Sequence, residues 1–281
     1  MKPICPSWLA SYPKSGNTWL RFILFHLFHG LGPVDSHELD GFINSRAWNP
    51  KNDPEDRVIK THYDFSQVSD RLEAVSSRDG KLGPSLYIVR HPLDVLQSAL
   101  AYAHLTGELS VEGNETMGSA AMTTWIEAYI DHKGHPLWMG GSVGSGTWPQ
   151  NVTSWLEAAK NDDAIKIIRY EDCLANPSAT VLRIAEHFDI TITRQTAEYI
   201  SGLTSFKALK EFETREIKVA DHEGKAFGRF SGDSRRIAHR KGIAFFNKGK
   251  KGVFRDVLTQ DQIDRAWASM SDVAIRCGYS L

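Results

Sequence analysis

Four short apolar runs recur along the chain, and three of them lead into a helical pattern. The runs predict strands at 8–12, 57–62, 85–92 and 164–172. Helices are predicted at 17–30, 93–104, 177–188 and 259–277, the last with Thr259 as its N-cap. Strands that alternate with helices predict a central parallel sheet with helices on both faces. We therefore expect an α/β fold.

Composition limits the class of partner. The 281 residues suffice for one large α/β domain or two small ones, and a net charge of -1 gives no general attraction to nucleic acid or to an anionic membrane. Cys5, Cys173 and Cys277 are widely spaced and odd in number, which argues against a disulfide framework and against a zinc site. The N-terminus lacks the apolar stretch of a signal peptide, and the apolar segment 19–31 is shorter than a membrane span. We expect a cytoplasmic protein without a membrane or nucleic-acid partner.

Two long segments interrupt the alternation of strands and helices. Residues 107–147 are rich in Gly, Ser and Thr, and residues 223–251 are polar, basic and dotted with glycine. Both exceed the length of ordinary connections, which indicates lids, binding loops or disordered segments. We expect 107–147 and 223–245 to line a substrate pocket.

The stretch "SYPKSGNTW" (Ser11–Trp19) lies between the first strand and the first helix. Gly16 permits a close backbone approach, and the N–H groups that follow it favour an anion at the helix N-terminus. Lys14 adds a positive charge, and Ser15 and Thr18 add hydroxyl donors. The order of residues differs from the Walker pattern. The alternative is a capped turn with an exposed lysine.

Two further pairs of residues follow predicted strands. Arg90 ends the third strand and Ser98 lies two helical turns later, so the pair can grip a second phosphate; the alternative is a surface ion pair of Arg90 with Asp94. Lys60 and His62 are two residues apart at the end of the second strand and share one face. A histidine can act as a general base and a lysine can stabilise negative charge. The alternative is that His62 is structural.

Together these motifs identify the chain as similar to the cytosolic sulfotransferases, which use 3′-phosphoadenosine 5′-phosphosulfate (PAPS). "YPKSGNTW" resembles the 5′-phosphosulfate loop YPKSGTTW and departs from it at Asn17, "VRHPLDVLQSAL" resembles the 3′-phosphate motif, and "KTH" resembles the strand with the catalytic histidine. The resemblance implies one domain over residues 1–281 with a P-loop-kinase-like fold. It also implies PAPS as co-substrate and no metal.

The resemblance assigns a role to each matching residue. His62 would be the general base, with Lys14 and Lys60 stabilising the transition state. Contacts to the nucleotide would come from Lys14, Ser15, Gly16, Asn17, Thr18, Trp19, Arg90, Ser98, Tyr170, Thr204, Phe206, Asn247, Lys248 and Gly249. Trp19 and Phe206 would stack on the adenine.

The C-terminal phosphate clamp departs from the family pattern RKGxxGDW. Asn247 stands where the family has an Arg, and Val253 and Phe254 replace Asp-Trp. A second match, Arg240–Gly242, leaves the register open. We prefer Asn247–Gly249 because the closing helix then follows at the family's spacing. As a basic loop, "FFNKGKKGVFR" can also be a solvated charge run.

The acceptor is expected to be a small molecule with a hydroxyl group, either aromatic or otherwise bulky. Similarity to bacterial enzymes that sulfate natural products suggests such a compound, but phenol, steroid, peptide and lipid remain open. A homodimer is a further open alternative. Two rival functions are a P-loop phosphotransferase, for which the Walker lysine and a Mg²⁺-binding carboxylate are missing, and a nucleotide-binding module without turnover.

Overall fold

A central parallel sheet organises the molecule. The computed structural model describes residues 6–34, 38–39, 43, 58–74, 82–109, 119–139, 144–223, 244–246 and 248–281. Within these residues, four strands pair in the order β2-β1-β3-β4, all parallel. They are β1 (Ser7–Ser11), β2 (Val58–Thr61), β3 (Ser85–Val89) and β4 (Ile165–Arg169). The predicted α/β class and parallel sheet are confirmed.

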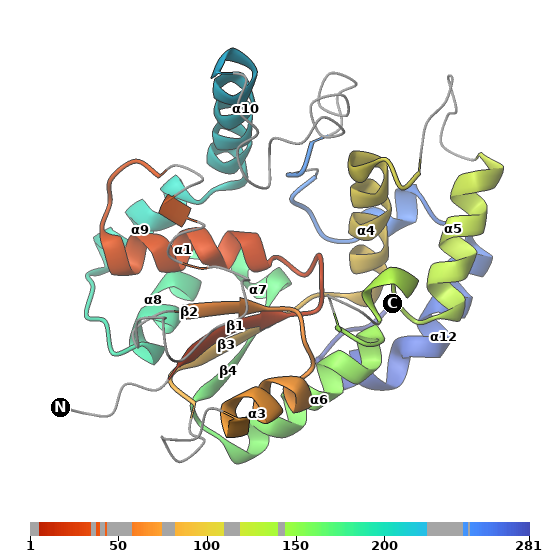
Figure 1. Ribbon diagram of the computed structural model, residues 1–281, viewed down its shortest axis with the longest axis horizontal. Coiled ribbons are helices and arrows are strands. Elements are labelled where there is room, and N and C mark those ends of the chain that lie inside the picture. Colours follow the sequence, from red (N-terminus) through yellow and green to blue (C-terminus); the bar gives the residue numbers. More distant parts are fainter. Residues whose placement is uncertain are drawn as a thin grey trace.

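Side-chain alternation along the strands divides the core in two. In β1, Trp8 and Ala10 join one hydrophobic cluster and Leu9 joins another, as the two-residue period of a strand requires. Helices therefore cover both faces of the sheet (Figure 1). Packed with the first cluster are α3 (Phe65–Ala74), α4 (Pro92–Thr106), α5 (Ala120–Asp131), α6 (Trp148–Asn161) and α12 (Gln260–Arg276). Packed with the second are α1 (Asn17–His29), α7 (Tyr170–Ala175), α8 (Pro177–His187) and α9 (Arg194–Leu203).

A third apolar cluster joins α10 (Phe206–Glu223) to α1. Phe212 of α10 meets Phe22 of α1 edge to face at 4.9 Å between ring centroids, and Phe246 is buried in the same cluster. Beyond this contact α10 rises from the body of the molecule (Figure 1). Two short 3-10 helices, η1 (Pro136–Trp138) and η3 (Val253–Asp256), complete the elements used below.

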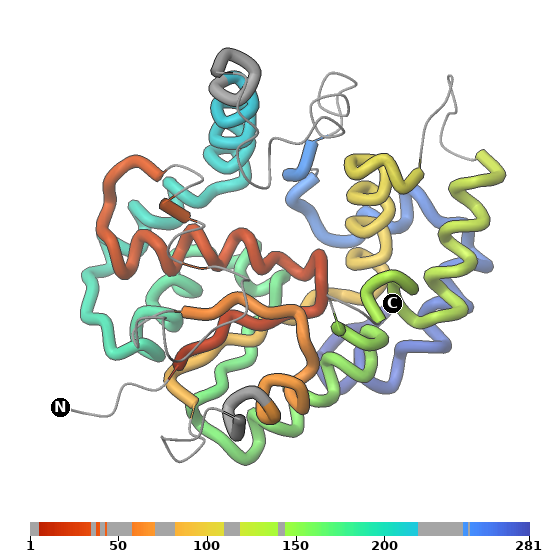
Figure 2. The backbone as a smooth tube through the Cα atoms, in the orientation of Figure 1, coloured from red at the N-terminus to blue at the C-terminus, as the bar shows by residue number. Residues whose placement is uncertain are grey.

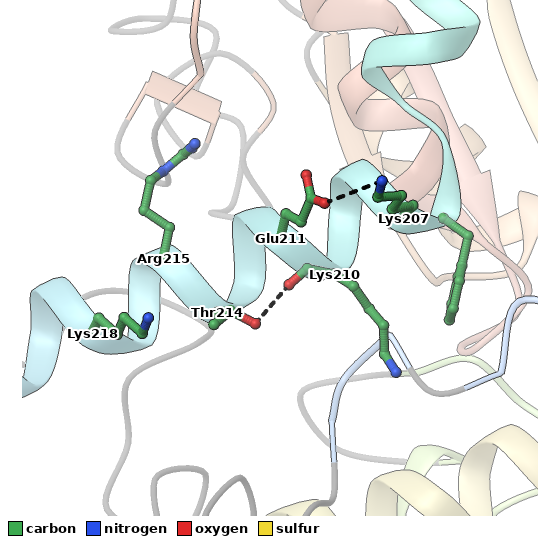
Figure 3. A pocket seen from close by; sticks show the side chains of 7 residues that line it. Lys207, Lys210, Glu211, Thr214, Arg215 and Lys218 are labelled. Atoms are coloured by element: carbon green, nitrogen blue, oxygen red, sulfur yellow. Dashed lines mark hydrogen bonds and ion pairs between the residues drawn. The ribbon is translucent and has the colours of Figure 1, made fainter.

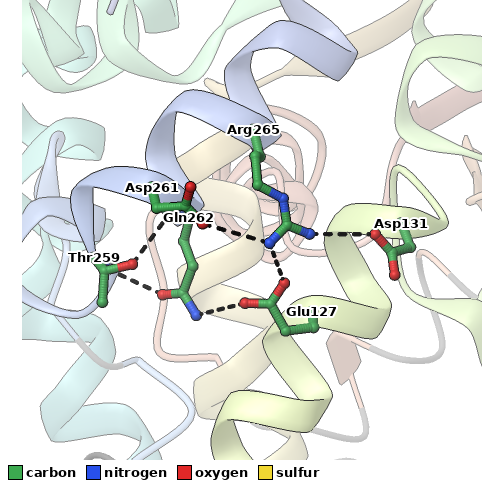
Figure 4. A network of polar contacts seen from close by, with 6 residues as sticks. All are labelled: Glu127, Asp131, Thr259, Asp261, Gln262 and Arg265. Atoms are coloured by element: carbon green, nitrogen blue, oxygen red, sulfur yellow. Dashed lines mark hydrogen bonds and ion pairs between the residues drawn. The ribbon is translucent and has the colours of Figure 1, made fainter.

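The last helix closes the fold, and its predicted cap is confirmed. The Thr259 hydroxyl accepts the N–H of Gln262, whose side chain in turn accepts the Thr259 N–H, so the pair forms a capping box. One turn later Arg265 binds Glu127 and Asp131 of α5 at 2.6 and 3.4 Å (Figure 4). These polar contacts fix α12 against α5.

The elements differ from the predicted ones in three places. Residues 107–147 are not one long loop, because α5 and η1 lie within them. The strand predicted at 164–172 ends at Arg169, since acidic residues in the first turn of α7 favour a helix N-terminus there. Helices α3, α6, α9 and α10 had no sequence prediction. Most of the predicted lid at 223–245 lies outside the described residues.

Candidate active site

Four predicted site residues or motifs follow the four parallel strands directly. The loop at Lys14 follows β1, His62 follows β2, Arg90 follows β3 and Tyr170 follows β4. Parallel strands end at the same edge of a sheet, where α/β proteins bind their ligands. In Figure 2 the chain leaves β1 and β2 at one edge, on the right of the view, before it turns into α1 and α3. The fold thus gathers motifs that are far apart in the sequence.

The anion loop has the left-handed backbone that a tight turn into a helix needs. Lys14 has a φ of 70° and Gly16 a φ of 107°. A Cβ on Gly16 would lie 2.7 Å from the ring of Tyr170, so only glycine fits without displacing that ring. The Ser15 hydroxyl is fully buried and has no partner among the described atoms. A buried donor at a helix N-terminus suits an anion.

Asn17, the departure from the family loop, ties the loop to the sheet. Its side-chain amide donates to the Leu9 carbonyl and to the Ser11 hydroxyl, both at 3.2 Å. The neighbouring Thr18 is buried at the start of α1. Asn17 therefore supports the conformation of the loop from below, whatever else it contacts.

The Lys14 ammonium lies between two aromatic rings. Its Nζ is 4.1 Å from the centroid of Tyr102 on α4 and 4.3 Å from that of Phe245. Cation–π contacts of this kind orient a lysine and are worth about 0.5–2 kcal/mol each. Tyr102 in turn lies 6.4 Å from Trp138 of η1. The lysine is thus directed toward an aromatic-lined region beside the anion loop.

The imidazole of His62 is held in one orientation by β1. Its Nδ1 is 2.8 Å from the Ser11 carbonyl oxygen, which can only accept a hydrogen bond. The proton of the neutral ring therefore sits on Nδ1, and Nε2 is the basic nitrogen. The buried Asn151 donates to the His62 carbonyl at 3.0 Å and fixes the backbone as well. Lys60 is buried two residues earlier, in β2.

Arg90 links the anion loop to the C-terminal loop. Its guanidinium donates to the carbonyls of Lys14 at 3.3 Å and Lys250 at 3.4 Å, and it lies 4.3 Å above the ring of Tyr170. Its Nε is buried without a described partner. Burial raises the pKa of Tyr170 although Arg90 opposes the shift, so the phenol stays neutral. Among the described residues Arg90 forms no ion pair with Asp94, which disfavours the surface-pair alternative.

Ser98 lies on the face of α4 that borders the C-terminal loop. Asp94, one turn before it, accepts the Gly252 N–H at 2.8 Å, and Tyr102, one turn after it, lies 6.3 Å from Phe245. Residues four apart share a helix face, so Ser98 is flanked by both contacts. It is partly buried.

The predicted adenine contacts are gathered around Tyr170 and Gly249. Trp19 meets Tyr170 edge to face at 5.6 Å, and the ring of Phe206 lies 2.3 Å from where a Cβ on Gly249 would stand. Thr204 is buried and its hydroxyl donates to the Ile200 carbonyl, so it caps α9. Lys248 is exposed and 3.6 Å from Asp256.

The register of the C-terminal clamp stays a prediction, because Asn247 and Arg240–Gly242 lie outside the described residues. Gly249 packs against the ring of Phe206, and the Lys250 carbonyl accepts a hydrogen bond from Arg90. The Gly252 N–H donates to the Asp94 carboxylate. Phe254, in place of the family's Trp, stacks on His91 at 5.3 Å. Residues 249–254 thus lie beside Phe206, Arg90, Asp94 and His91.

Several residues that position the site were not predicted from the sequence. Ser11 and Asn151 hold His62, and Glu213 of α10 holds the backbone of Phe245. Each acts across the fold on a residue from a different element, so no local pattern marks it. Tyr102 could have been predicted from the sequence, because it lies four residues after Ser98 and therefore on the same face of the helix.

The outer side of α10 carries a basic groove of about 610 Å³ (Figure 3). It begins at Phe206 and is lined by Lys207, Lys210, Glu211, Thr214, Arg215 and Lys218. The excess of positive charge beside Phe206 favours the approach of an anionic ligand to the site.

Comparison with known proteins assigns the family. The model of the sulfotransferase domain matches residues 6–271. The chain belongs to the sulfotransferase family. Among curated relatives of this sulfotransferase, rat Sulfotransferase 1A1 is 25% identical, over 96% of this chain and 85% of its own length. Cytosolic sulfotransferase 13 of Arabidopsis thaliana is 25% identical, over 92% and 74%.

Solved structures share the fold of this sulfotransferase. Mouse SULT7A1 complexed with PAP, the desulfated nucleotide, superposes with a TM-score of 0.64 at 20% identity, covering 98% of this chain and 89% of its own. Retinol dehydratase in complex with androsterone and PAP gives a TM-score of 0.65 at 17% identity, covering 98% and 81%.

Neither a metal cluster nor a membrane-spanning helix is present among the described residues. No group of three or more His, Cys, Asp or Glu side chains is arranged there to hold a metal ion. None of the helices described has the length and apolar character that crossing a membrane requires.

Proposed function

We propose that this sulfotransferase transfers the sulfuryl group of PAPS to a hydroxyl group of a small-molecule acceptor. The observation that carries the proposal is the position of His62, whose basic nitrogen is fixed by the Ser11 carbonyl at the sheet edge shared with the Lys14 loop and Arg90. A base beside an anion loop is the arrangement that transfer from an anionic donor needs.

The residues present fit a nucleotide with two anionic groups. The Ser15 hydroxyl, which has no partner among the described residues, and the N–H groups that open α1 suit the 5′-phosphosulfate. The Arg90 Nε, which likewise has no described partner, suits the 3′-phosphate together with Ser98. Both relatives' structures named above contain PAP. Bound PAPS would supply the sulfuryl group, which forms a bond to the acceptor oxygen as the bond to the bridging phosphate oxygen breaks.

In this proposal the chain supplies a base and positive charge. His62 takes the acceptor's hydroxyl proton at Nε2, and the Ser11 carbonyl stabilises the imidazolium through Nδ1–H. Lys14 and Lys60 neutralise the charge that develops on the leaving phosphate. Positioned proton transfer contributes about 10²–10⁴-fold to a rate, and preorganised charge usually contributes more.

The aromatic rings beside Lys14 favour an aromatic or otherwise apolar acceptor. The rings of Tyr102 and Phe245 lie beside the Lys14 ammonium, and the ring of Trp138 lies 6.4 Å from that of Tyr102. A natural product of the kind that bacterial enzymes sulfate, as the acceptor, and a homodimeric assembly are further proposals. A cytoplasmic location is supported by the names of relatives such as Cytosolic sulfotransferase 13.

The test is transfer from PAPS with a labelled sulfur to a panel of phenols and alcohols. We expect transfer by the wild type, and a kcat at least ~10²-fold lower for His62→Ala. The Kd for PAP should stay the same, because His62 acts on the acceptor. His132→Ala, which removes an exposed histidine, is the control.

Acceptors with different pKa values provide a more specific test of His62 as the base. The defect of His62→Ala should shrink as the acceptor's pKa falls, since an ionised phenolate needs no base. Normal turnover of a weakly acidic alcohol by the variant would show that His62 is structural. Tight PAP binding without transfer to any acceptor would favour the nucleotide-binding module.

A further inference from the structure

Glu213 is a buried carboxylate in a helix that also carries exposed charged side chains. Its exposed fraction is 3%, whereas the neighbouring Glu211 side chain, on the groove side of α10, is 68% exposed and lies 3.9 Å from Lys207 (Figure 3). Burying a carboxylate is costly unless both of its oxygens find partners. The burial of the Glu213 carboxylate therefore needs an explanation in its contacts.

Both oxygens of Glu213 bind consecutive backbone N–H groups of another segment. Oε1 accepts from Phe245 N at 2.6 Å and Oε2 accepts from Phe246 N at 3.1 Å. The ring of Phe246 is buried in the cluster between α1 and α10. The ring of Phe245 lies 4.3 Å from the Lys14 ammonium. One carboxylate thus sets the position of the residue that covers Lys14.

The same segment continues into the phosphate clamp. We define the strap as Phe245, Phe246 and residues 248–252, the described parts of this stretch. A second buried carboxylate, that of Asp94, accepts the Gly252 N–H at the far end of the strap. Between the two carboxylates, the strap meets Phe206 at Gly249 and Arg90 at Lys250. The strap is therefore anchored at both ends beside the proposed nucleotide site.

We propose that Glu213 is a positioning residue for the nucleotide site, acting through the strap. By holding the start of the strap it keeps Phe245 on Lys14 and directs the residues at 248–250 toward Arg90 and Phe206. This inference rests on the proposed function, because it takes the strap to be the wall that recognises the 3′-phosphate. Glu213 itself touches backbone and no reacting atom.

The test exploits the two acceptor oxygens of a carboxylate. In Glu213→Gln the shape is kept, but the amide nitrogen cannot accept a hydrogen bond, so one strap N–H faces another donor. We expect the Kd for PAP to rise about tenfold or more, the size of one lost charge-assisted hydrogen bond. The Kd for adenosine 5′-monophosphate, which lacks the 3′-phosphate, should rise much less.

Glu198→Gln is the control, because this exposed carboxylate of α9 pairs with Arg194 and does not line the basic groove. It should leave both Kd values within about twofold, as surface charges usually do. A merely structural Glu213 would lower the melting temperature of its variant without changing the ratio of the two Kd values. That unchanged ratio would overturn the inference. If the wild type itself fails to prefer PAP, it is the proposed function that fails.

A second variant keeps the inference testable if Glu213→Gln does not fold. Phe245→Leu removes the ring that contacts Lys14 and leaves the strap's N–H groups in place. We expect kcat for sulfuryl transfer to fall about fivefold, the scale of one cation–π contact, with a smaller change in the Kd for PAP. An unchanged kcat would show that the strap does not position Lys14.

Discussion

Gly16 shows at the scale of one residue how the backbone sets the site. Its φ of 107° and the ring of Tyr170 beneath it leave no room for a side chain. The guanidinium of Arg90 in turn lies 4.3 Å from the centre of the Tyr170 ring. The conformation of one glycine therefore determines where the loop, the ring and the arginine meet.

Gly16→Ala should destabilise the protein by about 1–3 kcal/mol, because alanine is strained in the left-handed region and its Cβ would displace Tyr170. Gly32→Ala is the control, since its Cβ would have no neighbour within 4 Å, and it should change stability by less than about 0.5 kcal/mol. Urea unfolding measures both. Equal stabilities of the two variants would contradict this account of the loop.

Candidate site residues could be predicted where a local sequence pattern marks them. Lys14, His62 and Arg90 each stand directly after an apolar run, so a strand end and a reactive side chain coincide in the sequence. Glu213 carries no such signal. Helical periodicity places it on the buried face of α10 with Leu209 and Ile217, four residues to either side. Its partners, however, come from a segment outside its own helix, and the local sequence does not record them.

Elements were predictable when their apolar pattern is continuous. The four strands are short and mostly apolar, and their positions agree with the prediction to within about three residues, as expected for element boundaries. Helix α5 was missed because glycine-rich stretches on both sides suggested a loop, although Met122, Ile126 and Tyr129 form a buried stripe. The glycine-rich composition of residues 107–147 obscured the helical periodicity of the shorter segment 120–131 within them.

The cap of α12 provides a prediction for one element. Thr259→Ala should lower the free energy of unfolding by about 1 kcal/mol, because the N–H of Gln262 loses its acceptor. Thr214→Ala is the matched control, since that exposed hydroxyl bonds back to Lys210 within α10 and satisfies no helix end. A loss no larger for Thr259→Ala than for Thr214→Ala in urea unfolding would argue against the capping box.

At the scale of the whole molecule, burial links histidine titration to stability. Five described histidines have pKa values lowered by burial, the largest cause for each: His26, His91, His104, His135 and His187. In His91 the neutral ring is required by its contacts. Its Nδ1 accepts the Leu93 N–H that caps α4, and its other nitrogen donates to the Ser280 carbonyl. A proton on Nδ1 would remove that cap.

The sign of the pH dependence follows from these lowered pKa values. Unfolded histidines titrate near pH 6.5, so below that pH the unfolded chain binds protons that the folded chain does not. Stability is therefore fully present above about pH 6.5 and is lost as the pH falls, at about 1.4 kcal/mol per pH unit for each histidine that stays neutral in the fold. We expect urea unfolding to give a clearly lower free energy at pH 5.5 than at pH 7.5. His91→Asn keeps an oxygen that can cap α4 but cannot titrate, so it should reduce the slope by up to one proton, whereas His132→Asn serves as the surface control. The same free energy of unfolding at both pH values would rule out this linkage.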